Sequence, residues 1–177
     1  MYCLEESNMV GLDKTWWGPR VWRAFHLLAE QSNRADSLGP WKTVLRLTAD
    51  AIPCQACRGH FGVALRRLHF PPAPVTADIV WKTIRSFLWS VHGETSSESI
   101  PEEALTDMYG GNREMRIQEA LDLITEVSTV WKAEPVPTWP AVTVWEKAVH
   151  SLAHRLLIYE MPVPPPPPPR GIHRFRR

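Results

Sequence analysis

Two predicted helices are separated by the stretch Ile52-Pro53-Cys54-Gln55-Ala56-Cys57. Pro53 ends the first of them, because proline lacks the N–H that an inner helical residue donates. The CxxC then lies at the start of the next helix. Its spacing brings two sulfurs close enough to form a disulfide or to bind a soft metal ion as thiolates. Unpaired N–H groups at a helix N-terminus also favour the thiolate. The stretch therefore predicts a helical fold with sulfur chemistry at a break between helices.

Helical periodicity continues on both sides of this stretch. Apolar residues recur at helical spacing on one face, and glycine or proline separates the segments. We expect one helix to open at Gly18-Pro19 and a second at Gly39-Pro40, with others over 54–69, over 77–93 after an N-cap at Thr76, and over 101–109, 113–131 and 141–159. No strand-like alternation with hairpin turns occurs, and no GxGxxG loop is present. The pattern predicts an all-α fold, an antiparallel bundle.

Length and composition divide the chain into four expected segments. We predict a flexible N-terminus over 1–13, a helical domain over 14–110, a helical extension over 111–160 and a disordered, proline-rich basic tail over 161–177. The formal net charge of +1 argues against nucleic-acid binding. The first nine residues lack the apolar region of a signal peptide, and no stretch is apolar enough to span a membrane. We therefore expect a cytoplasmic protein.

The chain has three cysteines, too few for a disulfide scaffold. Cys54 and Cys57 form the CxxC, and Cys3 has no obvious partner. In a cytoplasmic protein a CxxC is more often catalytic or metal-binding than structural.

Aromatic and imidazole side chains accompany the CxxC. Trp22 and His26 are four residues apart and so share one face of the first predicted helix. His92 closes the fourth predicted helix. In a four-helix bundle these side chains would converge with the cysteines at one end. An aromatic wall with a few polar groups suits a planar heteroaromatic cofactor.

These residues together resemble the Erv/ALR-type FAD-linked sulfhydryl oxidases, most closely the short forms of large DNA viruses. The resemblance covers roughly residues 14–100 and rests on three pieces: Trp17-Gly18-Pro19 with Trp22 and His26, then residues 52–57, then Phe87 with His92. It implies a four-helix bundle over 14–110 that holds FAD, usually as a homodimer. It places the protein in the host cytoplasm or the virion.

The resemblance also implies roles for individual residues. Cys54 would exchange with the thiols of a protein dithiol substrate or a small thiol redox protein. Cys57 would be the sulfur beside the flavin, which passes the electrons to O2 and yields H2O2. The positions that match cofactor contacts are Trp17, Trp22, His26, Cys57, His92 and Ser96.

The chain departs from the family pattern in two ways. An HNxVN-like motif usually ends the fourth helix, whereas residues 92–96 here lack both asparagines, and Ser96 offers only a shorter hydroxyl. Many relatives also carry a second cysteine pair that shuttles electrons, whereas this chain has only Cys3 besides the CxxC. Cys3 would be an intermolecular disulfide partner or an inert thiol.

Two other functions stay open. Cys54, Cys57 and His60 form a CxxCxxH, which with His69 or His26 would make a zinc-binding interaction module. Three zinc ligands within one and a half helical turns rarely form a tetrahedral site unless a second ligand pair lies elsewhere in the chain. Alternatively, the missing asparagines would mark a family member that has lost catalysis and serves as a scaffold.

Overall fold

The computed structural model describes residues 13–96, 100–133 and 138–158, and every regular element in these ranges is a helix. The all-α prediction is thereby confirmed. Cys3, nearly all of the predicted N-terminal segment 1–13 and the predicted tail 161–177 lie outside the described residues. No helix among the described residues is long and apolar enough to cross a membrane.

The first helix, α1 (Lys14–Glu30), begins earlier than the sequence predicts. We expected it to open at Gly18-Pro19, but Pro19 lies inside the helix. An inner proline near the N-terminus removes one backbone hydrogen bond there. Two features favour the earlier start of the helix. The Asp13 side chain accepts a hydrogen bond from the Thr15 N–H at 2.8 Å, and Trp17 is buried.

Two helices follow on either side of Pro53. A short 3-10 turn, η3 (Ala35–Ser37), leads into α2 (Leu38–Ala51), and α3 (Gln55–Arg67) follows the break. The buried positions of α2 recur at helical spacing, as its sequence predicts. They are Leu38, Trp41, Val44, Leu45, Thr48 and Ala51.

The fourth helix, α4 (Ala77–Thr95), is capped by Thr76 as predicted, because the side chain accepts a hydrogen bond from the Ile79 N–H at 3.3 Å. A 3-10 turn, η4 (Glu102–Ala104), continues into the short helix α5 (Leu105–Tyr109). Glycines end α5. A Cβ at Gly110 would collide with the Thr106 carbonyl, and Gly111 has a φ of +114°, which favours glycine.

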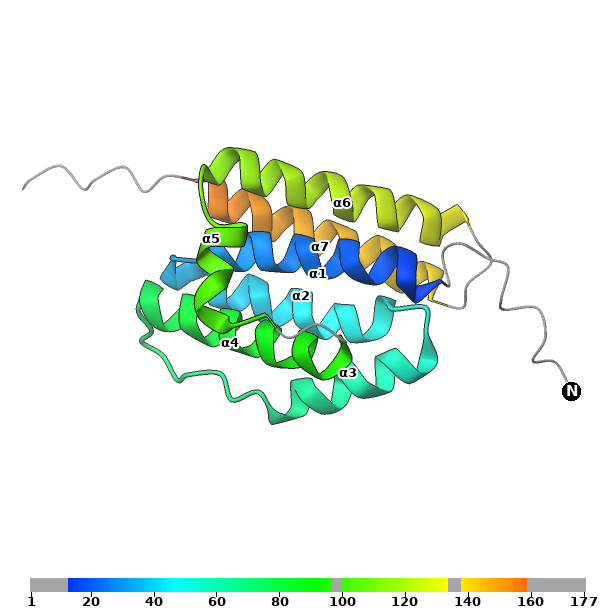
Figure 1. The fold of residues 1–177 in the computed structure, drawn as a ribbon, viewed down its shortest axis with the longest axis horizontal. Helices are drawn as coiled ribbons and strands as arrows, with labels where there is room; N and C mark the ends of the chain where they lie inside the picture. Colours follow the sequence, from blue (N-terminus) through cyan, green and yellow to red (C-terminus); the bar gives the residue numbers. More distant parts are fainter. Residues whose placement is uncertain (1–12, 97–99, 134–137, 159–177) are drawn as a thin grey trace, which may run out of the picture.

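The last two helices, α6 (Arg113–Ala133) and α7 (Trp139–Leu157), form an antiparallel pair that shares the core with the first half of the chain. Figure 1 shows three layers: α6 and α7 above, α1 and α2 in the middle, and α3 and α4 below. α1 packs on α6 and α4, while α2 packs on α7 and α3. The largest fully buried side chains come from both halves, among them Trp41, Trp131 and Trp145. The described helices, from α1 to α7, thus surround one hydrophobic core.

Candidate functional site

Cys54 and Cys57 are joined by a disulfide at the start of α3, with their Cα atoms 5.2 Å apart. Cys54 is the N-cap of α3, and its Sγ accepts a hydrogen bond from the Cys57 N–H at 3.2 Å. The prediction that the CxxC begins a helix is confirmed. Both cysteines are partly exposed. The sulfurs therefore lie at the positive end of a helix dipole, within reach of solvent.

Arg58 holds the segment before the disulfide in place, a role that the sequence did not reveal. Its guanidinium donates hydrogen bonds to the carbonyl oxygens of Ile52 and Pro53, at 2.9 and 3.1 Å. The side chain thus folds back across the turn that carries Cys54. A fixed positive charge beside a cysteine favours the thiolate over the thiol.

Three predicted residues, Trp22, His26 and His92, come together between α1 and α4. The rings of Trp22 and His92 are stacked, with centroids 4.8 Å apart and planes at 10°. His26 Nε2 and His92 Nδ1 are 3.0 Å apart, so one nitrogen donates a hydrogen bond to the other. The i, i+4 spacing predicts that Trp22 and His26 share one face of α1. The packing of α4 on α1 brings His92 next to both of them.

Tyr109 extends this cluster from α5. Its ring stacks on His26, with centroids 5.0 Å apart and planes at 18°. A partly buried ion pair fixes the segment that leads to it. Arg85 Nε lies 2.8 Å from Glu30 Oε1, and Thr106 Oγ1 donates a hydrogen bond to Glu30 Oε2 at 3.0 Å. We call Trp22, His26, His92 and Tyr109 the ring wall. No motif in the sequence marked Tyr109.

Phe61 connects the disulfide to the ring wall. It lies one helical turn after Cys57 on α3 and is buried. Its ring centroid is 6.5 Å from that of Trp22 and 6.1 Å from that of Phe87 on α4. The disulfide and the ring wall are therefore parts of one contiguous site.

Trp17 and Ser96 lie apart from the ring stack. Trp17 is buried against Trp131 of α6, at a centroid distance of 5.4 Å, and its indole N–H has no hydrogen-bond partner among the described residues. Ser96 is the C-cap of α4, and its N–H donates to the His92 carbonyl oxygen at 2.9 Å. Trp17 thus contacts the core, while Ser96 lies one turn beyond His92.

A hollow of about 230 Å³ opens beside the two histidines. It is smaller than the roughly 300–1,000 Å³ of typical ligand pockets, so it would hold part of a dinucleotide. The ring wall offers flat faces for stacking and imidazole nitrogens for hydrogen bonds, which are the contacts that a planar heteroaromatic ring makes. The residues that line the hollow are His26, Trp89, Ser90, His92, Gly93, Glu94, Ile100 and Leu105.

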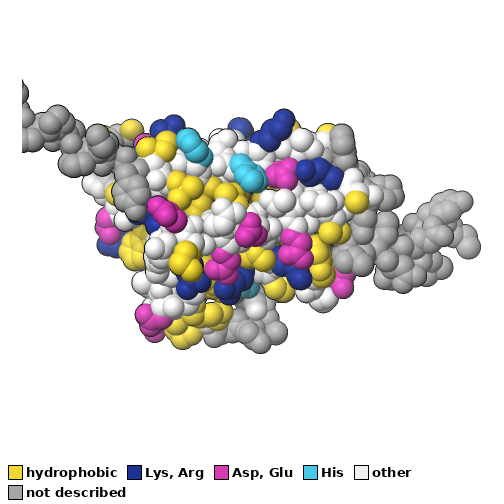
Figure 2. Space-filling view, turned by 90° about the horizontal axis from the view of Figure 1, so that it is seen from above, with side chains coloured by type: hydrophobic (Ala, Val, Ile, Leu, Met, Phe, Trp, Pro, Cys, Tyr) yellow, Lys and Arg dark blue, Asp and Glu magenta, His cyan; other side chains and the backbone are white. Residues whose placement is uncertain are grey.

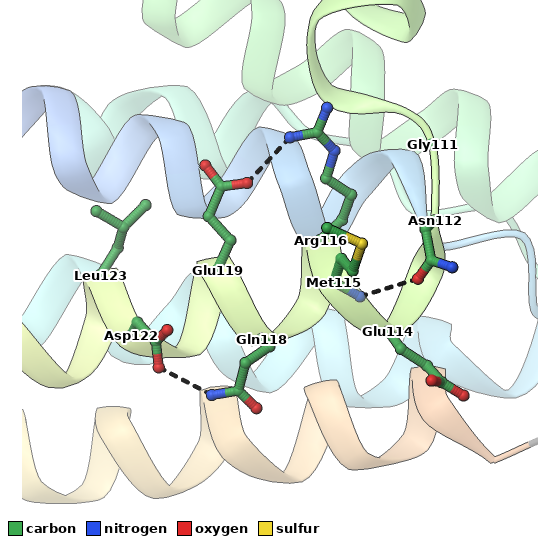
Figure 3. Close-up of a pocket in the computed structure, with 9 residues that line it drawn as sticks. All are labelled: Gly111, Asn112, Glu114, Met115, Arg116, Gln118, Glu119, Asp122 and Leu123. Atoms are coloured by element: carbon green, nitrogen blue, oxygen red, sulfur yellow. Dashed lines mark hydrogen bonds and ion pairs between the residues drawn. The ribbon is translucent and has the colours of Figure 1, made fainter.

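A second, more open hollow of about 870 Å³ lies along the start of α6. As Figure 3 shows, its polar side chains bond to one another: Arg116 to Glu119, and Gln118 to Asp122. It contains no aromatic ring and no cysteine. We assign it no function.

Metal ligands do not gather around the cysteines in the part of the chain that the structure describes. No group of three or more His, Cys, Asp or Glu side chains there could hold a metal ion. His60, the third ligand of the suggested CxxCxxH, instead contacts Glu94, with its Nε2 3.1 Å from a carboxylate oxygen. The geometry offers no support for a zinc module.

Comparisons with known proteins add no relative. No family model, no curated protein and no solved structure matches the chain.

The two histidines of the ring wall resist protonation. The pKa of His26 is lowered to about 4, first by burial and then by the charges of His92 and Arg85. Burial also lowers the pKa of His92. Only 2% of His26 is exposed. At neutral pH both rings are therefore uncharged, and each has one nitrogen that can accept a hydrogen bond.

Acidification is expected to destabilise the protein through His26. Between pH 6.5 and 4 the unfolded chain binds a proton at this residue that the folded chain does not. The stabilisation is therefore complete above pH 6.5 and is lost as the pH falls. From pH 7 to pH 5 the loss amounts to about 2 kcal/mol of unfolding free energy.

Urea unfolding of the wild type and of His26→Phe at both pH values measures this loss. The phenylalanine keeps a ring on Tyr109 but cannot bind a proton. The variant should therefore lose about 2 kcal/mol less than the wild type between pH 7 and pH 5. Equal pH dependence in the two proteins would contradict the assignment.

Proposed function

We propose that the chain is an FAD-linked sulfhydryl oxidase of the Erv/ALR type. In this proposal α1–α4 form the catalytic four-helix bundle, and α6 and α7 cover its α1–α2 side. The observation that carries it is the accessible Cys54–Cys57 disulfide, which Phe61 joins to the ring wall. A dithiol centre that lies one helical turn from a ring next to the ring wall is suited to electron transfer from sulfur to a planar cofactor.

The chain's own chemistry begins with a substrate thiolate. It attacks Cys54 Sγ, the Cys54–Cys57 bond breaks, and a mixed disulfide forms while Cys57 leaves as a thiolate. The second substrate thiol attacks the mixed disulfide. The substrate leaves oxidised, and both cysteines are left reduced. The start of α3 and the nearby Arg58 guanidinium stabilise the thiolates that form.

FAD, when bound, would accept the electron pair from the reduced cysteines and pass it to O2, which yields H2O2. The residues that would hold it are Trp22, His26, His92 and Tyr109, with Ser96 and the hollow beyond His92 for the rest of the dinucleotide. Trp17 would act by packing α1 against α6. The proposed substrate is a protein dithiol or a small thiol redox protein. The homodimer and the setting in host cytoplasm or virion also belong to this proposal.

Two observations favour a second function, a scaffold that has lost catalysis. The hollow beside His92 is smaller than a dinucleotide needs, and both asparagines of the family motif are absent. A scaffold would bind no flavin and would produce no peroxide from dithiothreitol with added FAD.

Substitution of His92 by alanine tests the proposed cofactor wall. If FAD stacks on the ring wall, the loss of one aromatic face should weaken FAD binding about tenfold. Titration of the purified protein with FAD, followed by the absorbance band near 450 nm, measures this affinity. His150→Ala serves as the matched control, because His150 is exposed on α7. Unchanged FAD affinity in His92→Ala would remove the ring wall from the proposal, and no FAD binding by the wild type would favour the scaffold.

A further inference from the structure

The segment that carries the disulfide contains charges of one sign. Residues 51–77 contain three arginines, Arg58, Arg66 and Arg67, and no aspartate or glutamate. The whole chain, by contrast, has a net charge of only +1. Asp50 and Asp78 border this segment, and Asp78 pairs with Lys82 at 2.9 Å. Glu94 of α4 contacts α3 at His60. The helix that begins at the disulfide therefore carries an excess positive charge.

Two of these arginines face solvent without a carboxylate partner. Arg66 and Arg67 are exposed in the last turn of α3. No described carboxylate forms an ion pair with either of them. Cations in a last helical turn also favour the helix through its dipole, but that effect does not require them to be unpaired.

Part of the unpaired charge lies nearer to the disulfide along the axis of α3 than its place in the sequence suggests. Arg66 Nη1 lies 3.7 Å from the place where a Cβ on Gly62 would stand, so its guanidinium is folded back along α3. Gly62 follows Cys57 by five residues, which is roughly 8 Å along the helix axis and roughly 140° around it. From the other side, exposed Lys42 of α2 lies over the ring of Phe70, just after α3, at 4.9 Å. We call Lys42, Arg58, Arg66 and Arg67 the basic face.

The surface on the α6 side differs from the basic face. Figure 2 shows acidic and basic side chains interspersed there. The arginines on this side also have carboxylate partners. Arg20 pairs with Glu126, and Arg23 and Arg116 pair with Glu119. The excess positive charge is therefore a local property of the basic face.

We propose that the basic face docks the thiol substrate, and that this substrate is an acidic protein segment with Asp or Glu side chains near its cysteines. This inference rests on the proposed function, because it identifies what the disulfide oxidises. An extended segment rises roughly 3.3 Å per residue, so carboxylates three or four residues from the attacking cysteine would reach the Arg66 guanidinium. Complementary charge of this kind raises the rate of encounter and selects the partner.

Single-turnover reduction of the disulfide tests this proposal without reference to the flavin. Three reduced CxxC peptides, flanked by four glutamates, four serines or four lysines, are mixed anaerobically with the full-length oxidised protein. Maleimide trapping and mass spectrometry then count the reduced cysteines over time. Each rate is divided by that of the same peptide with hydroxyethyl disulfide, because flanking charges change thiolate reactivity.

The glutamate peptide is expected to react about tenfold faster than the lysine peptide at low salt. At 1 M salt the difference should disappear, because the Debye length falls to about 3 Å. In the double variant Arg66→Gln and Arg67→Gln the ratio should fall to about twofold, while reduction by dithiothreitol stays unchanged. Lys147→Gln, an exposed charge on α7, is the control and should keep the wild-type ratio.

The outcomes separate this proposal from the oxidase proposal. Equal normalised rates for the three peptides, or a preference that survives in the double variant, would overturn the docking proposal and leave the oxidase proposal intact. A preference for the acidic peptide that depends on the two arginines supports docking. That result would stand even if the protein binds no flavin.

Discussion

Replacement of Cys57 by serine is expected to abolish oxygen-dependent thiol oxidation, with a fall in rate of more than about 10³-fold. A serine hydroxyl cannot form the disulfide that Cys57 shares with Cys54, so the electron pair of a substrate thiol has no acceptor. Oxygen uptake with dithiothreitol, measured on FAD-loaded protein, reports the rate. The bound FAD should stay near the wild-type amount, because the ring wall is untouched.

The controls for this experiment come from the chain's other cysteines. Cys3→Ser makes the same chemical change outside the CxxC and should leave the rate unchanged. Cys54→Ser should lose dithiol oxidation as fully as Cys57→Ser. A Cys57→Ser protein that consumes oxygen at the wild-type rate would refute the proposed electron path.

The parts of the site that sequence predicts well are local. Pro53 and the CxxC are adjacent, so their position at the start of a helix follows from backbone chemistry alone. Trp22 and His26 share a face because four residues make about one helical turn. The same helical geometry separates Trp17 from Trp22. It lies five residues before Trp22, which turns it roughly 140° away around α1, and the structure places it against α6.

The parts that sequence does not predict depend on contacts between distant helices. Tyr109 reaches His26 because the Glu30–Arg85 ion pair and Thr106 bring the α5 segment to α1. Phe61 reads as an ordinary core residue of α3, yet it joins the disulfide to Trp22. Periodicity reveals which face of a helix is apolar but does not identify the helix that covers it.

The packing of α6 and α7 was left open by the sequence for the same reason. Their apolar faces favoured simple packing, with a dimer interface or a partner site as alternatives. In the structure these faces lie against α1 and α2, on the side away from α3 and α4 (Figure 1). The C-terminal helices α6 and α7 therefore pack against the layer that carries Trp22 and His26. Loss of that support should affect the stability of the whole fold.

Replacement of Trp145 by alanine is expected to lower the free energy of unfolding by about 3–5 kcal/mol. Trp145 has no exposed surface, and its ring lies 5.4 Å from that of Trp131 and 6.5 Å from that of Phe25. Its indole N–H donates to Thr48 Oγ1 at 3.0 Å, so the variant also removes a buried hydrogen bond. Typical domains have a free energy of unfolding of roughly 5–15 kcal/mol, so the variant should still fold.

Urea unfolding followed by tryptophan fluorescence measures the loss, and Val144→Ala is the matched control. Val144 precedes Trp145 on α7 but is 52% exposed, so its truncation should change stability by less than about 0.5 kcal/mol. A second probe, the reactivity of Cys54 and Cys57 after reduction, tests whether the site shares this core. Its midpoint should shift with the fluorescence midpoint, because α1 and α2 pack against both α7 and the helices of the site. A loss below about 1 kcal/mol, or separate midpoints, would mean that α6 and α7 fold independently of the disulfide site.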